Sequence, residues 1–301
     1  MRVVELSGGV GGARLARGLA ALDDVDLTVV VNVGDDADNH GLHISPDLDT
    51  VVYTLADEEG PQGWGRAGDT FDFNDELARF GVDNRFQLGD RDLALKVFRT
   101  VEMAKGTPLS KVTATVTDGF GIEATVLPVT DERLRTEVRL DDGWVSFQEY
   151  FVARGHRDDV HEIRFAGADR AGPAPGVIEA MATADMLVIG PSNPPLSIWP
   201  MLAVPGIREA VQGHPYVTAV SPLIGGKTVK GPADRVMSSL GLGTGNQAVL
   251  ASYEGLIHRL VIDHADAAET DRLRGVELRV TDTLIGEKGQ ATRLSRELLG
   301  R

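Results

Sequence analysis

Hydrophobic residues near the start of the chain form short continuous runs that alternate with stretches of helical spacing. The runs Val3–Leu6 and Leu27–Asn32 are rich in valine, which is typical of strands buried on both faces of a parallel sheet. Apolar positions that recur every three or four residues predict helices over Ala13–Leu22, Asp47–Ala56 and Leu93–Ala104. This alternation indicates an α/β protein with a mostly parallel, Rossmann-like sheet and helices on both faces.

The middle of the chain has a different pattern. Short β-like segments follow one another with turn residues between them, at Glu123–Pro128, Leu134–Leu140, Trp144–Phe151 and His161–Phe165. These segments could form an inserted portion or an edge of the main sheet. We expect residues 1–301 to form a single α/β domain, in which an inserted portion of helices and strands at about residues 60–170 covers the substrate.

The alternation of strands and helices returns from Val177 to the end of the chain. The predicted helices are Val177–Ala182, Ile207–Gln212, Ala233–Leu240, Ala265–Arg274 and a last helix after residue 280. The predicted strands are Met186–Ile189, Tyr216–Val220, Arg259–Ile262 and Val276–Val280.

Small and polar residues follow four of the predicted strands. These exits are Ser7–Gly12, Val33–Asp36, Gly190–Pro194 and Ser221–Lys227. In doubly wound sheets, ligands bind at the carboxyl ends of the strands. The four exits together therefore predict a binding site at that edge of the sheet.

The glycine-rich turn SGGVGG predicts an anion site. It begins like a dinucleotide fingerprint, but Arg14 stands where the third small residue should lie, which disfavours NAD. Backbone N–H groups at a helix start, with Arg14 nearby, could hold a phosphate, although a tight turn without a ligand is also possible. The segment Ser221–Thr228 lacks the first glycine of a nucleotide-binding P-loop and precedes poor helix sequence, which excludes that class.

Carboxylates gather after the second strand. Asp35 and Asp36 follow it directly, and Asp47 and Asp49 come about a dozen residues later. A group of carboxylates near a phosphate site suits Mg²⁺. Because Asp47 follows Pro46 at a predicted helix start, we favour a structural role for Asp47. We favour a functional role for Asp35 and Asp49.

Composition removes several function classes. A net charge of −15 without a basic segment argues against nucleic-acid binding. The absence of cysteine removes disulfides and thiolate chemistry and favours a cytoplasmic protein, and no apolar run is long enough to span a membrane. His40 and His43 form no recognisable zinc motif. Aromatic residues between Trp144 and Phe151 fit a core or a sheet face better than a stacking platform.

Five segments together resemble a known family. In order they are SGGVGGARL, VVVNVGDDADNHGLHISPDLDTVVYTL, LGDRDLA, GPSNPPLSI and AVSPLIGGKTVKGPA. They are similar to the 2-phospho-L-lactate transferases of deazaflavin coenzyme (coenzyme F-420) biosynthesis, also called phosphoenolpyruvate transferases. The resemblance implies that a guanosine diphosphate adduct donates a phospholactyl or phosphoenolpyruvyl group to 7,8-didemethyl-8-hydroxy-5-deazariboflavin. It also implies release of GMP, a requirement for Mg²⁺ and a homodimer.

The candidate residues fit this chemistry, since phosphoryl transfer depends on positioning and charge stabilisation. We expect Asp35, Asp36 and Asp49 to hold Mg²⁺, with Asp35 or Asp49 orienting or deprotonating the attacking hydroxyl. The resemblance implies that Asp49 and Gln87 reach the deazaflavin. Residues expected to hold the donor are Ser7, Gly8, Gly9, Gly11, Gly12, Arg14, Ser192 and Asn193. The alternative is a regulatory protein of related fold that binds a nucleotide sugar and catalyses nothing.

Overall fold

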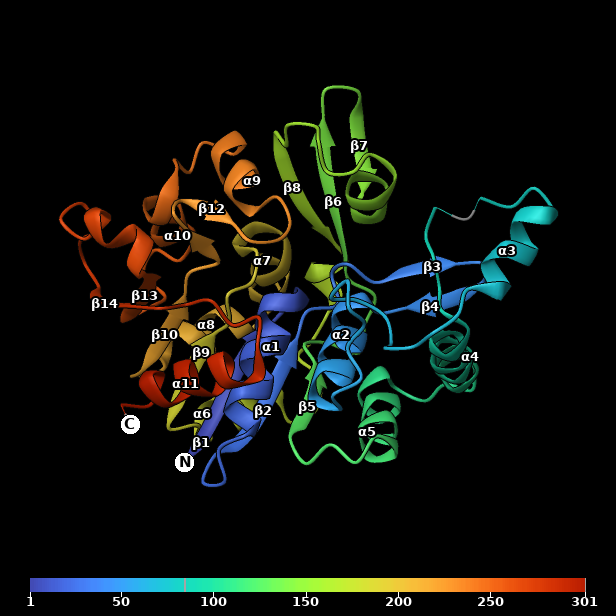
Figure 1. Ribbon diagram of the computed structural model, residues 1–301, viewed down its shortest axis with the longest axis horizontal. Helices are drawn as coiled ribbons and strands as arrows, with labels where there is room; N and C mark the ends of the chain where they lie inside the picture. Colours follow the sequence, from blue (N-terminus) through green and yellow to red (C-terminus); the bar gives the residue numbers. More distant parts are fainter. Residues whose placement is uncertain (84, 301) are drawn as a thin grey trace.

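A parallel sheet forms the centre of the computed structural model, which describes residues 1–83 and 85–300 (Figure 1). All neighbouring strands in this sheet pair in parallel. In sheet order, its seven strands are β14 (Glu277–Thr281), β13 (Arg259–Asp263), β10 (Val217–Val220), β9 (Met186–Ile189), β1 (Arg2–Ser7), β2 (Asp26–Val31) and β5 (Thr125–Pro128). The predicted α/β, Rossmann-like class is confirmed.

The order of the strands reverses between β1 and β9. From β1 the chain adds β2 and β5 on one side, and it then returns to add β9, β10, β13 and β14 on the other. The connections of the two halves leave the sheet in opposite directions at this point. A crevice therefore opens beyond the carboxyl ends of β1 and β9, where ligands bind in doubly wound sheets.

Helices cover both faces of the sheet (Figure 1). On one face α1 packs against both α2 and α11, and on the other α6 packs against α8. The α-helices are α1 (Gly9–Ala20), α2 (Pro46–Leu55), α3 (Asp72–Arg79), α4 (Asp90–Ala104), α5 (Leu109–Gly119), α6 (Val177–Thr183), α7 (Trp199–Leu202), α8 (Ile207–Gly213), α9 (Ala233–Ser239), α10 (Gly245–Ser252) and α11 (Lys288–Leu298).

Burial on both faces explains the continuous apolar runs. Val3 and Leu6 of β1 have no exposed surface, and Val29 of β2 is equally buried beside them. Each such side chain contributes about 1.5–3 kcal/mol when it is removed from water. The central strands are therefore the rigid support from which the polar loops at their carboxyl ends project.

Two excursions leave the central sheet on the side of β5 (Figure 1). Between β2 and β5 lie the hairpin of β3 (Ala37–Asn39) and β4 (Leu42–Ile44) and then α2 to α5. Between β5 and β9 lies an antiparallel sheet in the order β7, β6, β8 (Gly143–Ser146, Arg135–Leu140, Glu162–Ala166). The expected inserted portion at 60–170 therefore contains β5, a strand of the central sheet, and is not one continuous insertion.

Two predicted elements differ from the structure. The predicted strand Trp144–Phe151 ends at Ser146 and continues as a π-helix over Glu149–Ala153, because its apolar residues pack at helical spacing on one side. The predicted helix Ala265–Arg274 is only a 3₁₀ helix over His264–Glu269, which begins at an Asp263 cap. A second 3₁₀ helix covers Ala168–Arg170, a further π-helix covers Pro194–Ile198, and β11 (Leu223–Ile224) and β12 (Lys227–Thr228) form a small hairpin.

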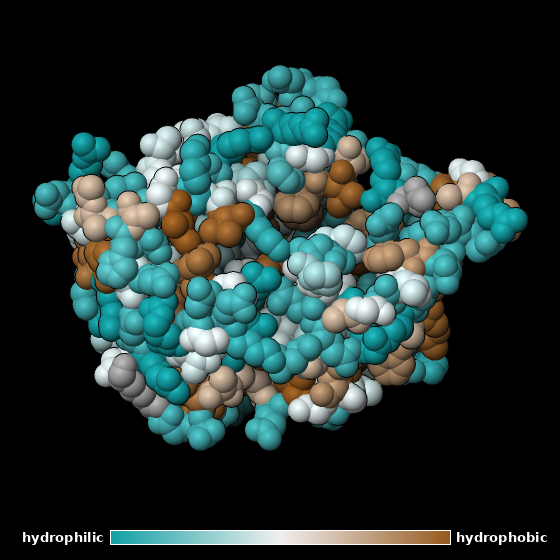
Figure 2. Space-filling view, viewed as in Figure 1, coloured by the Kyte–Doolittle hydropathy of each residue, from teal (hydrophilic) through white to brown (hydrophobic). Residues whose placement is uncertain are grey.

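The surface is mainly hydrophilic on the face shown in Figure 2, with hydrophobic side chains gathered in the hollow below the lobe formed by β6 to β8. Among the described residues, no helix combines the length and apolarity needed to cross a bilayer.

Candidate functional site

A cavity of about 490 Å³ lies at the carboxyl ends of β1, β2 and β9, where the strand order reverses. Its walls come from the glycine turn after β1, the acidic loop after β2, the start of α2, the π-helix at Glu149–Ala153 and the loop after β9. The predicted exits of these three strands therefore meet in one site. The exit of β10 borders a second, smaller cavity instead.

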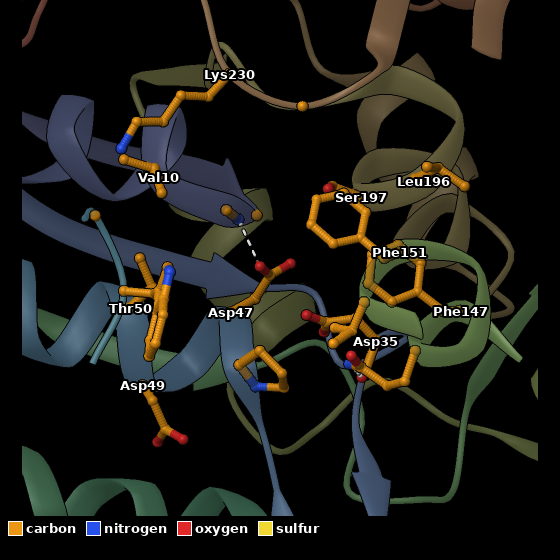
Figure 3. Close-up of a pocket in the computed structure, with 18 of the residues that line it drawn as sticks. Val10, Asp35, Asp47, Asp49, Thr50, Phe147, Phe151, Leu196, Ser197 and Lys230 are labelled. Carbon is orange, nitrogen blue, oxygen red and sulfur yellow. Dashed lines mark hydrogen bonds between the residues drawn. The ribbon is translucent and has the colours of Figure 1, made fainter. Parts of the chain in front are cut away.

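Two N–H groups of the glycine turn are already bonded within the protein. The Gly8 N–H donates to Ser192 Oγ at 3.1 Å, and the Gly9 N–H donates to Asp47 Oδ1 at 2.7 Å (Figure 3). By helix geometry, the next N–H groups, of Val10 and Gly11, have no partner inside α1. An anion at this turn would therefore meet the N–H groups of Val10 and Gly11, not those of the whole turn.

Close approach of the loop after β9 explains the glycine at position 11. A Cβ atom on Gly11 would overlap the carbonyl oxygen of Pro191. One on Gly12 would overlap the Ser7 hydroxyl in the same way. The glycines thus allow the start of α1 to lie directly against the exits of β1 and β9.

Asp35 and Asp47 form a buried acidic pair in the cavity wall (Figure 3). The Asn32 amide joins them, since Nδ2 donates to Asp47 Oδ2 at 2.9 Å and to Asp35 Oδ1 at 3.4 Å. Burial raises the pKa of Asp47 to about 6. Burial, followed by the negative charges of Asp47 and Asp36, raises the pKa of Asp35 well above its usual range. In such a pair, burial and the neighbouring negative charge favour the neutral form of at least one carboxyl group.

Asp36 stands beside this pair but serves the hairpin of β3 and β4. Its Oδ2 accepts a hydrogen bond from Ser45 Oγ at 3.0 Å and lies 2.9 Å from His43 Nε2. Asp36 is not part of the cavity wall. One oxygen of Asp36 therefore supports the start of α2. Among the described residues its other oxygen has no hydrogen-bond partner, and its role as a metal ligand stays a prediction.

Asp49 borders the same cavity, but its carboxylate is directed away from Asp35 and Asp47 (Figure 3). Lys96 Nζ lies 2.7 Å from one oxygen, and Arg99 pairs with the other. Burial favours the neutral acid, yet the charges of Arg99 and Lys96 outweigh it and lower the pKa of Asp49. Asp49 of α2 therefore forms an ion-pair cluster with Lys96 and Arg99 of α4, and it does not contact Asp35.

The other predicted residues reach the cavity in different ways. Ser192, Asn193 and Gln87 all line it. The Asn193 side chain also accepts a hydrogen bond from the Leu196 N–H at 3.2 Å, which caps the following π-helix. Ser192 and Asn193 are therefore fixed at the crevice, while Gln87 lies at its exposed rim.

An aromatic wall faces the cavity, which the sequence did not indicate. Phe147 and Phe151 stack with ring centroids 5.1 Å apart, and both line the cavity. The amide of Gln148 donates to the Asp35 carbonyl oxygen at 2.7 Å and holds this wall beside the acidic loop. The expectation that these rings serve only as core or sheet-face residues is incomplete, because the helical turns after β7 place these two rings, four residues apart, on the same side.

The second cavity, of about 170 Å³, adjoins the first at the glycine turn. The two share Val10, Gly11, Pro191, Asn193 and Lys230 as wall residues. Arg14 lines only the second cavity, and its guanidinium lies 2.7 Å from Glu59 Oε1. The start of α1 therefore forms a boundary between two neighbouring spaces.

The sequence pattern favours a structural role for Asp47, because it lies at a helix start, and a functional role for Asp49. In the structure, Asp47 lies beside Asp35, and Asp49 is held by ion pairs. Two residues apart on a helix, these side chains point in directions about 200° apart, so only one of them can face Asp35. The side chain of Asp47 faces Asp35, and the buried Asn32 amide, directly after β2, holds the two carboxylates from behind the cavity wall. Asn32 directly precedes the acidic loop in the sequence, and this adjacency is the signal that could have identified it. Among the described residues, no three His, Asp or Glu side chains are grouped to hold a metal ion by themselves.

Comparison with known proteins gives a consistent result. The family model for "2-phospho-L-lactate transferase CofD" matches residues 3–287. A phosphoenolpyruvate transferase of Streptomyces coelicolor is 42% identical, over 99% of this chain and 97% of the relative. A 2-phospho-L-lactate transferase of Methanopyrus kandleri is 39% identical over the same shares.

The fold has a counterpart among solved structures. A member of the UPF0052 family from Bacillus halodurans aligns with a TM-score of 0.68, over 99% of this chain and 98% of that one. At 18% identity this likeness concerns the fold alone. The sequence matches and the crevice at the reversal of strand order together show that the chain belongs to the 2-phospho-L-lactate transferase family of coenzyme F-420 biosynthesis.

Proposed function

We propose that this transferase moves a phospholactyl or phosphoenolpyruvyl group from a guanosine diphosphate adduct to the ribityl hydroxyl of 7,8-didemethyl-8-hydroxy-5-deazariboflavin. The hydroxyl oxygen forms a bond to the β-phosphorus of the donor. The bond between that phosphorus and the bridging oxygen breaks, GMP leaves with this oxygen, and a phosphodiester remains. The homodimer implied by the resemblance stays a prediction.

The observation that carries the proposal is the arrangement of three kinds of wall around one cavity. The glycine turn offers N–H groups at the start of α1, the acidic pair lies beside it, and Phe147 and Phe151 form an apolar wall. Such a wall suits a flat deazaflavin ring. The adjoining smaller cavity, with Arg14 and Asn193, suits the nucleoside end of the donor.

The acidic pair fits a magnesium ion. Asp35 and Asp47 are both buried and are joined by the Asn32 amide. Among the described residues, no cationic side chain lies within ion-pair distance of either one, which supports a place for a cation. Mg²⁺ is usually held by one or two carboxylates together with water and substrate phosphates, so two ligands from the chain suffice. When bound, Mg²⁺ would offset the negative charge on the phosphate oxygens.

The remaining groups would orient the reactants. Asn32 fixes the direction of the Asp47 carboxylate, and the Gly9 N–H holds its other oxygen. We infer that a carboxylate of the pair takes the proton of the attacking hydroxyl, since both line the cavity. Asp49, with two cationic partners and a lowered pKa, is a poor proton acceptor.

The test is a transfer assay with purified protein, the deazaflavin, Mg²⁺ and each three-carbon donor in turn. GMP and the new phosphodiester are followed by mass. We expect Asp35→Asn to lower the rate about a hundredfold or more. The exposed Asp38→Asn, which alters a surface pair with Arg133, should leave the rate unchanged. Binding of GDP without turnover of any donor would instead support the regulatory nucleotide-binding alternative.

A further inference from the structure

Lys230 occupies the boundary between the two cavities. It lines both of them, and Figure 3 shows its ammonium group beside Val10 at the start of α1. Nζ donates a hydrogen bond to the backbone carbonyl oxygen of Gln62 at 2.8 Å. In the part of the chain that the structure describes, no carboxylate oxygen lies within ion-pair distance of this ammonium group.

Among the described residues, the other lysine and arginine side chains that line the two cavities each pair with a carboxylate, namely Arg14, Arg85 and Lys96. The surroundings of Lys230 disfavour its charge, because burial and the neighbouring Arg14 lower the pKa of Lys230, and Glu59 offsets this only in part. The nearby Lys227 differs, since its Nζ lies 3.3 Å from Asp234 Oδ2 and it lines neither cavity. The ammonium group of Lys230 is thus placed to receive an anion that the protein itself does not provide.

The partner of Lys230 lies in a loop that borders the larger cavity. We call residues 58–68 the cover loop; it contributes Gly63, Trp64 and Gly65 to the cavity wall. Its base is fixed to α1 through Glu59, which pairs with Arg14 and Arg17. Its tip is held to the 227–232 loop by the Lys230 bond to Gln62.

The tip of the cover loop is built closely around this ammonium group. Gly63 has φ +85°, and a Cβ atom there would overlap Lys230 Nζ. A backbone carbonyl is a neutral acceptor, and a phosphate oxygen forms a stronger, charge-assisted bond with an ammonium group. An anion that reaches the start of α1 can therefore compete with the Gln62 carbonyl for Lys230.

We propose that Lys230 is a positioning residue that exchanges the Gln62 carbonyl for a phosphate oxygen of the donor, and so releases the tip of the cover loop when the donor binds. The inference rests on the proposed function. When the donor occupies the nucleotide end of the site, the cover loop is released and the space beneath it becomes accessible. Donor binding then precedes entry of the acceptor.

Two measurements on the full-length protein test this exchange, with GDP and Mg²⁺ as the probe. The variants are Lys230→Met and Lys230→Arg, with Lys227→Met as the matched control. Loss of one charge-assisted hydrogen bond should weaken GDP binding about ten- to a hundredfold in Lys230→Met. Lys230→Arg should recover part of this loss, and Lys227→Met should bind GDP as the wild type does.

Hydrogen exchange of the cover loop provides a second measurement. A variant that only lost affinity for GDP, without any change in the cover loop, would not alter it. In the wild type, GDP should speed exchange of residues 60–66, because their tie to Lys230 is broken. In Lys230→Met, exchange should be fast without GDP, and GDP should add nothing. A GDP affinity within twofold of wild type in Lys230→Met, or cover-loop exchange equal to wild type in that variant, overturns the inference while the transfer assay stands. A wild type that binds no GDP overturns the proposed function as well.

Discussion

Replacing Glu5 with leucine should stabilise this protein, and more strongly as the pH rises. Glu5 lies in the middle of β1 with no exposed surface. Among the described residues, neither of its carboxyl oxygens has a hydrogen-bond partner. Burial raises its pKa well above the ordinary value of 4.5. The folded protein therefore carries Glu5 as the neutral acid, and burying this unpaired carboxyl group lowers the stability of the fold.

The sign of the pH dependence follows from proton uptake. Above about pH 4.5 the unfolded chain ionises Glu5, whereas the folded chain keeps the proton up to its raised pKa. The unfolded state then binds fewer protons, so the free energy of unfolding falls as the pH rises. The loss is at most about 1.4 kcal/mol per pH unit, so between pH 4.5 and pH 7 Glu5 accounts for at most about 3 kcal/mol.

Two variants separate this contribution from the rest of the cost. Glu5→Gln removes the titration but keeps an unpaired polar group in the core. Glu5→Leu removes that group as well and should gain a further stabilisation of about 1–3 kcal/mol, the cost of an unsatisfied buried polar group. Urea unfolding at pH 5, 6 and 7 gives the stability of each variant relative to the wild type. The difference for Glu5→Gln should grow as the pH rises, by at most about 1.4 kcal/mol per pH unit, while the exposed Glu123→Gln should show no such trend. A difference that stays flat from pH 5 to pH 7, or a wild type more stable than Glu5→Leu, would refute the reasoning.

Three further changes test the site. Asp49→Ala leaves the buried Arg99 without a carboxylate partner, while Lys96 keeps Asp92, and it should lower the free energy of unfolding by about 3–5 kcal/mol in urea. An unchanged midpoint would contradict the ion-pair cluster. Gly11→Ala should abolish transfer because its methyl group overlaps the Pro191 carbonyl, whereas Gly213→Ala, which meets open space, should retain full turnover. Asp47→Asn should slow transfer and also remove a loss of stability between pH 3.8 and about pH 6, at most about 3 kcal/mol. Transfer rates and urea unfolding are measured for the wild type and Asp47→Asn across this pH range. The same pH dependence of stability in both proteins would contradict the acidic pair.

The continuous apolar runs were sufficient to predict the central sheet. Runs such as Val3–Leu6 and Leu27–Asn32 can be satisfied only when both faces of a strand are covered, and this requirement is local to the sequence. The loops after β1, β2 and β9 were likewise identified as parts of one site, because parallel strands bring their carboxyl ends to the same edge. The family was also accessible from the motifs in these loops.

The sequence was less informative where local patterns are ambiguous. The segment after β7 contains closely spaced aromatic residues, and only packing against the acidic loop selects a π-helix that turns Phe147 and Phe151 toward the cavity. β5 is short and is the first of several short β-like segments in the sequence, so only its pairing with β2 shows that it belongs to the central sheet.

What the sequence by itself determined is therefore the sheet, the edge at which ligands bind and the residue types gathered there. Only the tertiary structure decided which carboxylates face one another. Asp47 meets Asp35 through the Asn32 amide, while α4 brings Lys96 and Arg99 to Asp49. The physical reason is that the charge partners of these acids lie on other elements, and their positions are set by packing between helices instead of by spacing along the chain.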